Sequence, residues 1–576
     1  MKATRLICAM AAFTACAVVA GAQNMYDAIN FSRNEYYGTA RSMALGNAVT
    51  AVGGDLGTVG INPAGAAVAN YSQITITPGV AISVVGSAYS PSGELQYGPQ
   101  RSYSDSRLTL PNFGATVVAS TGRTRGLKSF TFGLISNQTS QYNYYANAFG
   151  QNSQTSKVAE FASAAAGLDE GLLAGSNAFD ASGVSWDIIT AYQAGMFGTY
   201  GNGNNYVGVT EMIDGSGKWH YVPGPLSQNS LTQKWGSKND IVINYAMNFS
   251  DKVFVGVNLG FPYARYGYSE SFYESAVNPD QFPIVYNMDD GSQVETNFLS
   301  ASYGYRYLAD VDGVYAKFGL IVTPFEGLRL GAAIQTPTMY TVTEHWQYSA
   351  STSFADSMFD DSQSSPEGEY SYNLKSPYSA NFGVAWTFGT RGFVSVDYEV
   401  TDYSVMRFYE INPGRTYPQD IFADLNDANR YFAGVAHSLR VGGEYRVSPA
   451  FSVRAGFGLS TTPERHWTNN LGENVTVDDF LADYNSYMMT RTKQLVSYRY
   501  YGDKTKYVSF GVGYSSPGSF FADLGAVWTG YPDTLFAPYY DYNNNDAAGN
   551  AVNAASPKIL NHRSLWNVAL TIGWRF

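Results

Sequence analysis

The chain has 576 residues, of which only 14% are charged while 15% are aromatic, including 46 Tyr. Soluble domains average about 25% charged residues, so the composition argues against an ordinary series of soluble domains. The net charge of −12 argues against nucleic-acid binding, which needs a basic surface.

Residues 1–22 have the pattern of a secretory signal peptide. A basic start is followed by an apolar stretch at 6–19 and by the small-x-small sequence Ala-Gly-Ala at 20–22. We expect cleavage after this sequence; a lipoprotein cut before Cys16 is the alternative, and its flanking residues fit less well. Both cysteines, Cys8 and Cys16, lie in the removed segment, so the mature protein has no disulfide.

Residues 23–70 follow and contain no apolar stripe. They are rich in Gly and Ala and include the sequence Asn62-Pro63-Ala64-Gly65. A segment with so few large apolar side chains cannot bury a core of its own, so it can order only inside another structure.

Period-two alternation of apolar and polar residues recurs from residue 71 to the C-terminus and predicts transmembrane strands. Examples are 253–261 (VFVGVNLGF), 451–459 (FSVRAGFGL) and the last strand, 564–576, which ends on Phe576. After the signal peptide no run of 18 apolar residues could form a membrane helix. A terminal aromatic residue resembles the signal that the outer-membrane assembly machinery reads.

Very short turns alternate with long polar segments along this region, as in an outer-membrane barrel with tight periplasmic turns and long extracellular loops. The alternation predicts an all-β fold, a closed antiparallel transmembrane β-barrel of about 14 strands. A soluble β-sandwich or propeller would not explain the aromatic strand ends. The segments expected to be long loops are 87–109, 145–238, 274–312, 350–367, 411–431, 461–504 and 532–563.

The second of these loops is expected to contain helix. Val158, Phe161, Leu168 and Leu172 stand at near-helical spacing in the sequence from 156 to 175. Such an apolar face needs a partner, which is either a ligand groove or a neighbouring loop.

A barrel of about 14 strands has a lumen too wide to be filled by its own side chains, and residues 23–70 are the expected plug. Residues 40–68 (ARSMALGNAVTAVGGDLGTVGINPAGAAV) resemble the N-terminal hatch of the FadL/TodX family of outer-membrane transporters for hydrophobic compounds. The resemblance implies three parts: a signal peptide at 1–22, a hatch at 23–70 and a barrel at 71–576.

The resemblance also implies a function. In that family an apolar ligand enters at a groove in the loops, reaches a lumenal pocket near the hatch, and leaves sideways at an inward kink of the third strand. The third strand is expected at 128–145, where polar Ser136-Asn137-Gln138 interrupt the apolar alternation. The alternative is that the strand simply emerges above the membrane there.

Candidate ligand contacts follow from these expectations. For the loop they are Phe161, Leu168 and Leu172, and for the lumen Met25, Tyr26, Ile29 and Phe31. Lumen-facing Arg440 and Arg454 are candidates for a carboxylate head group; the alternative is an ion-pair network, with residues such as Glu399, that holds the plug.

No catalytic role, metal site or cofactor is expected. The five His are scattered, and the zinc-protease and serine-hydrolase motifs are missing from the sequence. Asp541, Asn543 and Asn545 resemble the start of a calcium loop but lack its later Gly and Glu.

The sequence therefore predicts a monomeric outer-membrane protein for passive uptake of small hydrophobic compounds, whether fatty-acid-like or aromatic. Its expected partners are membrane lipid and lipopolysaccharide, the apolar ligand and the assembly machinery. One rival is a barrel resembling PorV of the type IX secretion system, which binds secreted proteins. The other is an open polar porin.

Overall fold

The computed structural model describes residues 25–91, 97–200, 204–213, 220–288, 290–411, 421–488, 493–500, 503–545 and 550–576. The expected signal peptide and its cleavage site lie outside these residues. No helix in the described part of the chain is long and apolar enough to cross a membrane.

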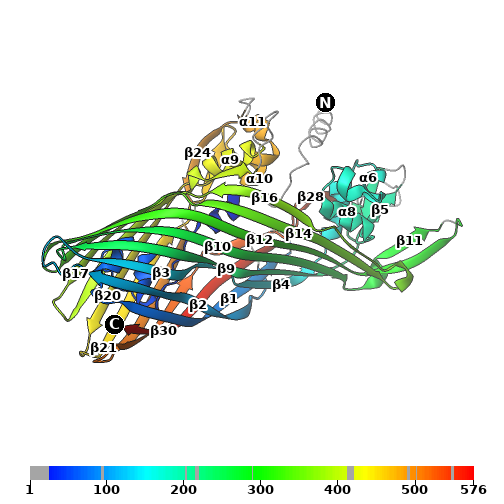
Figure 1. The fold of residues 1–576 in the computed structure, drawn as a ribbon. Helices are drawn as coiled ribbons and strands as arrows, with labels where there is room; N and C mark the ends of the chain where they lie inside the picture. The colour runs from blue at the N-terminus through cyan, green and yellow to red at the C-terminus, as the bar shows by residue number, and fades with distance from the viewer. Residues whose placement is uncertain are drawn as a thin grey trace.

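The chain forms a closed antiparallel barrel of 14 wall strands (Figure 1), which confirms the fold class. Each wall strand pairs with the next, and the last pairs with the first. In order, the wall strands are β1 (Gln73–Ser90), β2 (Arg101–Ser120), β3 (Leu127–Gln141), β9 (Leu226–Phe249), β10 (Val253–Ala276), β12 (Gln293–Phe325), β13 (Leu328–Gln335), β17 (Ser379–Thr387), β18 (Gly392–Asp402), β20 (Val435–Arg446), β21 (Phe451–Thr461), β25 (Lys504–Ser515), β26 (Phe520–Gly530) and β30 (Lys558–Arg575).

Further strands extend the wall or form small hairpins in the loops. The extensions are β4 (Tyr144–Asn152), β14 (Met339–Phe354), β16 (Gly368–Lys375) and β19 (Arg407–Glu410). The others are β5 (Phe197–Tyr200), β6 (Asn205–Gly208), β7 (Met212–Ile213), β8 (His220–Tyr221), β11 (Pro283–Asn287), β15 (Asp361–Ser364), β22 (Arg465–Asn469), β23 (Asn474–Val475), β24 (Leu495–Tyr500), β27 (Thr534–Phe536), β28 (Tyr542–Asn545) and β29 (Ala551–Ala554).

An apolar belt surrounds the outside of the barrel. On β30 the outward residues run from Trp566 through Val568 and Leu570 to Trp574, all exposed, while inward Thr571 is buried. Tryptophan at both ends of an apolar band is the pattern of a strand that crosses an outer membrane.

The wall strands are longer than the sequence predicts, so several of the expected loops extend too far along the chain. β2 begins at Arg101, β9 at Leu226 and β12 at Gln293, inside segments expected to be loops. Above the belt the outward side chains become polar, as in the ion pair between Arg265 and Asp310, yet backbone pairing continues. Apolar alternation therefore marks only the part of a strand that faces lipid.

Helical loops gather at the end of the barrel opposite the C-terminus (Figure 1). The expected loop helix is present but is divided in two at Gly167, whose φ of 89° ends the first part. The loop helices are α5 (Lys157–Ala165), α6 (Gly171–Ala174), α7 (Ala178–Ala181), α8 (Trp186–Gln193), η2 (Pro279–Gln281), η3 (Ser357–Phe359), η4 (Tyr403–Val405), α9 (Ala423–Phe432), α10 (Val477–Ala482) and α11 (Tyr484–Met488).

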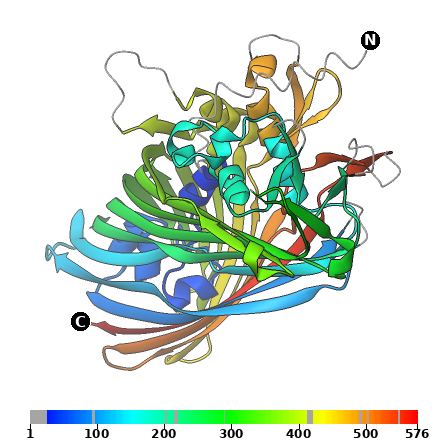
Figure 2. The same cartoon turned by 90° about the vertical axis from the view of Figure 1, so that its right-hand side faces the viewer.

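The segment before β1 lies inside the ring of strands (Figure 2). We call residues 25–70 the hatch. It contains only short helices, separated by turns with positive φ at Gly46, Asn47, Gly53 and Gly54. They are α2 (Met25–Ser32), α3 (Ala40–Ala44), α4 (Leu56–Val59) and η1 (Pro63–Val68).

Candidate functional site

The backbone of the hatch is hydrogen-bonded by side chains of the wall. Because the hatch has little regular structure, many of its carbonyl groups have no helical or ladder partner, and burial without one would be costly. Polar side chains on the inner face of the wall supply the missing donors. These contacts are Lys238 Nζ to Phe31 O (2.8 Å), Ser509 Oγ to Ala44 O (3.0 Å), Tyr507 OH to Gly46 O (2.9 Å), Arg329 Nη1 to Val52 O (2.8 Å), Asn258 Nδ2 to Val59 O (2.8 Å), Lys317 Nζ to Gly60 O (2.7 Å) and Asn244 Nδ2 to Pro63 O (3.1 Å).

Asn62 joins the hatch to itself and to the wall. Its fully buried side chain donates from Nδ2 to Thr50 O at 2.7 Å and to Leu320 O of β12 at 3.2 Å. Its Oδ1 accepts from Ala64 N at 3.1 Å and caps η1. The Asn-Pro-Ala sequence thus lies at a contact between two hatch segments and the barrel.

Four pairs of glycines on the wall form the surface against which the hatch packs. In each pair the two glycines stand opposite each other on adjacent, paired strands. A Cβ on Gly442 would lie 2.2 Å from Leu45 O, and one on Gly525 would lie 2.6 Å from Ala40 O. This surface, the glycine seat, comprises Gly256 and Gly319, Gly331 and Gly383, Gly442 and Gly456, and Gly511 and Gly525.

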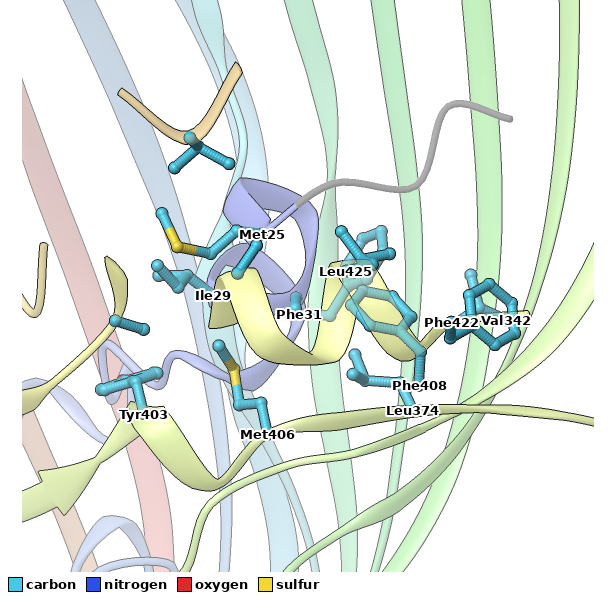
Figure 3. Packing of buried hydrophobic residues seen from close by; sticks show 14 of the residues in the cluster. Met25, Ile29, Phe31, Val342, Leu374, Tyr403, Met406, Phe408, Phe422 and Leu425 are labelled. Carbon is cyan, nitrogen blue, oxygen red and sulfur yellow. The ribbon is translucent and has the colours of Figure 1, made fainter. Parts of the chain in front are cut away.

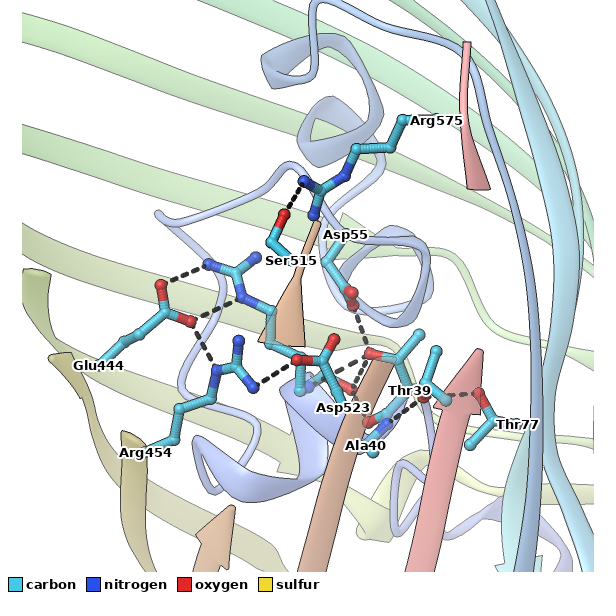
Figure 4. Close-up of polar contacts among 12 residues, drawn as sticks. Thr39, Ala40, Asp55, Thr77, Glu444, Arg454, Ser515, Asp523 and Arg575 are labelled. Carbon is cyan, nitrogen blue, oxygen red and sulfur yellow. Dashed lines mark hydrogen bonds and ion pairs between the residues drawn. The ribbon is translucent and has the colours of Figure 1, made fainter. Parts of the chain in front are cut away.

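Ion pairs also hold the hatch, and Arg454 is one of their members (Figure 4). Glu444 accepts from Arg41 of the hatch at 2.8 Å and from Arg454 at 2.6 Å, and Arg454 also contacts Asp523 at 2.6 Å. Because Arg454 forms ion pairs with two carboxylates, it fits an ion-pair network that holds the plug better than it fits a site for a ligand head group.

Arg440 forms a second such group with Glu399 and the hatch. It is paired with Glu399 and lies over the ring of Tyr36, 4.9 Å from the centroid. Tyr36 OH in turn donates to Glu399 at 3.3 Å. Of the residues considered for an ion-pair network, Glu399 pairs with Arg440, whereas Arg454 pairs with Glu444 and Asp523.

An apolar layer lies on the loop side of the hatch and is built around α2 (Figure 3). Met25, Ile29 and Phe31 are buried in it, whereas Tyr26 is 54% exposed. The surrounding side chains come mainly from wall strands, from the extensions β14, β16 and β19, and from α9. They include Tyr142, Tyr266, Tyr307, Val342, Tyr372, Phe408, Phe422 and Leu425.

The candidate residues of the long loop belong to a separate apolar cluster. Phe161 is buried, and its ring lies 5.2 Å from that of Tyr303 on β12. Leu168 packs at the edge of this cluster, while Leu172 is 37% exposed. Phe161 is therefore part of the loop's own core, and Leu172 is the member of the three that faces outward.

The hatch replaces β2 as the partner of β3. The β2–β3 ladder stops at Asn112 and Asn137. Just beyond it, Tyr37 N donates to Gln138 O at 2.9 Å and Glu35 N donates to Thr139 O at 2.8 Å. Asn137 and Gln138 are buried, so at this point the edge of β3 that leaves β2 faces the hatch.

Among the residues that the structure describes, the upper half of β2 has no strand partner on the edge beside this point. From Arg101 to Thr109 it pairs with β1, while β4 pairs with β9. Leu108, on the outward face of the unpaired part, is 88% exposed. A cavity of about 250 Å³ opens between the two edges, lined by Tyr103, Ser104, Asp105, Arg107, Tyr144, Tyr145, Gln233, Lys234 and Trp235.

A second cavity, of about 110 Å³, lies within the lumen next to the hatch. Its lining is largely polar and includes hatch residues Arg33, Asn34 and Glu35 together with Arg440 and Glu399. Arg33 was not among the candidate residues, because it stands outside both the hatch motif and the strand alternation.

Metal chemistry has no support in the described part of the chain, where no group of three or more His, Cys, Asp or Glu could hold an ion. Asp541, from the sequence that resembles a calcium loop, instead accepts from Ser556 N at 2.7 Å and lies 3.6 Å from Lys558 Nζ.

No protein-family model and no curated protein matches the chain, but solved structures do. It is similar to a Pseudomonas aeruginosa FadL homologue, with 12% identity over 94% of this chain and 98% of that one and a TM-score of 0.45. It is also similar to the Pseudomonas putida toluene transporter TodX, with 10% identity over 94% of this chain and 99% of that one and a TM-score of 0.44. For the Ralstonia pickettii toluene transporter TbuX the identity is 12% over 94% of this chain and 99% of that one, and the TM-score is 0.41. The structural neighbours of this chain over most of its length are thus hydrophobic-compound transporters of the FadL/TodX kind. This is the same family whose N-terminal hatch residues 40–68 resemble.

Proposed function

We propose that this protein is an outer-membrane channel for passive uptake of small hydrophobic compounds, which leave the barrel sideways between β2 and β3. The observation that carries the proposal is the exchange of partners at Gln138, where the hatch takes the place of β2 on the edge of β3.

The hatch makes a straight passage along the barrel axis unfavourable. Its backbone lies directly on the glycine seat, and wall side chains such as Lys317 and Asn244 hydrogen-bond to it. A ligand that moved past it would have to break several buried hydrogen bonds at about 1–3 kcal/mol each. These contacts also argue against the open-porin rival.

The apolar layer around α2 supplies an environment in which a hydrophobic compound is better solvated than in water. Each buried CH₂ contributes about 0.8 kcal/mol, so affinity should increase about fourfold for each CH₂ added to an aliphatic ligand. Met25, Ile29 and Phe31, already in the layer, would contact such a ligand as α2 moves aside, and Tyr26 and Leu172 offer exposed apolar surface on its path.

The gap beside β3 offers the way out. Leu108 and Leu110 on the unpaired part of β2 face outward and are exposed, so a compound that reached them would pass into lipid and not into the periplasm. Tyr103 and Tyr145 face each other across the gap with ring centroids 5.5 Å apart. The two rings therefore form an aromatic contact between the two edges.

A cross-link across the gap tests the proposal. Since the mature chain is expected to have no cysteine, Tyr103→Cys and Tyr145→Cys can be combined and joined by a short bifunctional maleimide. Uptake of a hydrophobic compound by cells should stop in the joined double variant. Each single variant, treated with the same reagent, is the control and should continue to take up the compound.

Complete cross-linking with unchanged uptake would exclude the lateral route. The secretion-partner rival makes a different prediction: an apolar ligand would not bind saturably, and a secreted protein would be recovered with the barrel.

A further inference from the structure

A hollow interrupts the apolar belt on the outer face of the barrel. One row of outward residues crosses four neighbouring strands, β18, β20, β21 and β25, and consists of Val394, Gly443, Ala455 and Phe510. The two residues in the middle of this row are small, so they leave space between larger neighbours. This space, the notch, has a volume of about 570 Å³ and is bordered by apolar side chains that include Phe388, Val394, Tyr445 and Val453.

The notch opens to lipid and lies away from the gap beside β3. Its bordering residues Phe388, Val394, Tyr445 and Val453 are all exposed on the outside of the barrel. Because β3 is the third wall strand and β20 the tenth of 14, the notch lies on the opposite side of the ring. Its volume is within the range of about 300–1,000 Å³ that is usual for small-molecule sites. A site here is therefore separate from the proposed uptake route.

Two arginines stand at the end of the notch where the strands meet the short turns. Arg391 borders the notch from the turn between β17 and β18, and Arg446 ends β20 beside it, with Arg446 N donating to Arg391 O at 2.8 Å. Both residues are exposed. Within the described ranges neither guanidinium forms a hydrogen bond or an ion pair. Like charges side by side on paired strands are unfavourable, so this pair indicates an anion from outside the chain.

The carboxylate that borders the notch does not neutralise these two arginines. Glu444 accepts instead from Arg41 of the hatch at 2.8 Å and from Arg454 at 2.6 Å (Figure 4). Both of these partners lie on the inner side of the wall. The outer end of the notch therefore keeps the positive charge of Arg391 and Arg446, directly next to an apolar space.

We propose that the notch binds one anionic phospholipid, with an acyl chain over Gly443 and Ala455 and the phosphate at Arg391 and Arg446. Short turns mark this end of the barrel as periplasmic, and the periplasmic leaflet of an outer membrane consists of phospholipid. A guanidinium can bind a phosphate through two parallel N–H···O contacts. A zwitterionic lipid would bring a second cation toward the two arginines, so an anionic head group fits better.

The test titrates the mature protein in detergent with phosphatidylglycerol or phosphatidylethanolamine that carry the same acyl chains. Native mass spectrometry gives the dissociation constant of the first bound lipid. Wild type should prefer phosphatidylglycerol, and the double variant Arg391→Gln/Arg446→Gln should lose this preference and bind phosphatidylglycerol about tenfold more weakly, as expected for two cations near a membrane surface. Gly443→Leu, which fills the notch, should weaken both lipids alike. A Cβ at this position lies 3.5 Å from its nearest atom, Phe393 O, so the barrel should fold, which the gel shift on heating checks.

Arg123→Gln/Arg125→Gln is the matched control. It also removes two exposed cations from a periplasmic turn, but there the outward residues above the turn, Val117 and Phe132, are large and leave no such row of small residues. This control should bind both lipids as the wild type does. Equal binding of the two lipids by wild type, an unchanged affinity in the Arg391→Gln/Arg446→Gln variant, an equal loss in the control, or wild-type binding by a folded Gly443→Leu variant would each overturn the site.

Discussion

A segment with little secondary structure depends on side chains for its hydrogen bonds, and in the hatch this dependence is visible at single residues. Asn62 was recognisable from the sequence, because an Asn before Pro in a glycine-rich segment is suited to satisfy nearby backbone groups. Wall residues that also hydrogen-bond to the hatch backbone, such as Asn258 and Lys317, could not be recognised from the sequence. The pattern shows that a polar residue faces the lumen but not which group it contacts there.

Asn62→Ala should loosen the hatch while the barrel stays folded. The substitution removes the hydrogen bonds to Thr50 O, Leu320 O and Ala64 N, and each buried group that loses its only partner costs about 1–3 kcal/mol. Faster proteolysis within residues 25–70 and reduced uptake are the expected results. Asn70→Ala, at an exposed position in the same segment, is the control, and equal protease resistance of the two variants would contradict the prediction.

Glu211, in the loop between β6 and β7, should make that loop sensitive to pH. Loss of water contact raises the pKa of Glu211 to about 8, although Gly208 N donates to its carboxylate at 2.8 Å. An unfolded Glu titrates near pH 4.3. Between these values the folded loop holds a proton that the open loop releases, so the loop becomes less stable as pH rises from about 4.5 to 8.

Hydrogen exchange of β6, corrected for its intrinsic dependence on pH, measures this effect. Protection should fall between pH 5 and pH 9 in the wild type and stay level in Glu211→Gln, whose amide cannot ionise. Glu295→Gln, at an exposed site, should behave as the wild type. The same slope in wild type and Glu211→Gln would show that another group controls the loop.

At the scale of elements, the position of the hatch depends on where the wall strands carry glycine. Apolar alternation identified the strands and their order, because lipid imposes a strict period of two on the outward face. It could not locate the glycine seat, since a lumen-facing glycine looks the same whether it meets solvent or a hatch. It also missed the upper parts of β2, β9 and β12, which pair outside the lipid.

Gly442→Ala should displace the hatch, whereas Gly443→Ala should not. A Cβ at position 442 would lie 2.2 Å from Leu45 O, a backbone atom that cannot rotate away, while a Cβ at 443 meets its nearest atom, Phe393 O, at 3.5 Å. In planar bilayers Gly442→Ala should raise ion conductance because water can pass the shifted hatch. Gly443→Ala, one residue away on the outer face, should keep the low conductance of the wild type.

A conductance change of equal size in the two variants would mean that the effect comes from β20 itself and not from the hatch.

The whole molecule is a barrel with a plug, and this level was the most accessible from sequence. The terminal strand and the alternation of turn lengths each depend on local pattern. The partner exchange at Gln138 was not accessible in the same way, because it requires Tyr37 and Gln138 to meet across about a hundred intervening residues.

We expect the mature protein to begin at Gln23 and to migrate faster on gels before boiling than after it. The ring of 14 strands closes through β1 and β30, with Phe576 N donating to Ser72 O at 2.9 Å, and a ring without free edges resists detergent until heated. Intact-mass measurement and gel shift check the two statements. A retained leader, or the same mobility at both temperatures, would contradict them.

The glycine seat also limits how such a protein can change over generations. Several of its members face backbone atoms of the hatch: Gly331 faces Thr50 O, Gly442 faces Leu45 O, and Gly456 faces Gly46 N. A clash with a side chain can be relieved by a second mutation that makes the side chain smaller. A clash with a backbone atom cannot, because no substitution removes that atom. Descendants can therefore change the side chains around α2 and in the loops in single steps, while the seat positions that face hatch backbone admit only glycine.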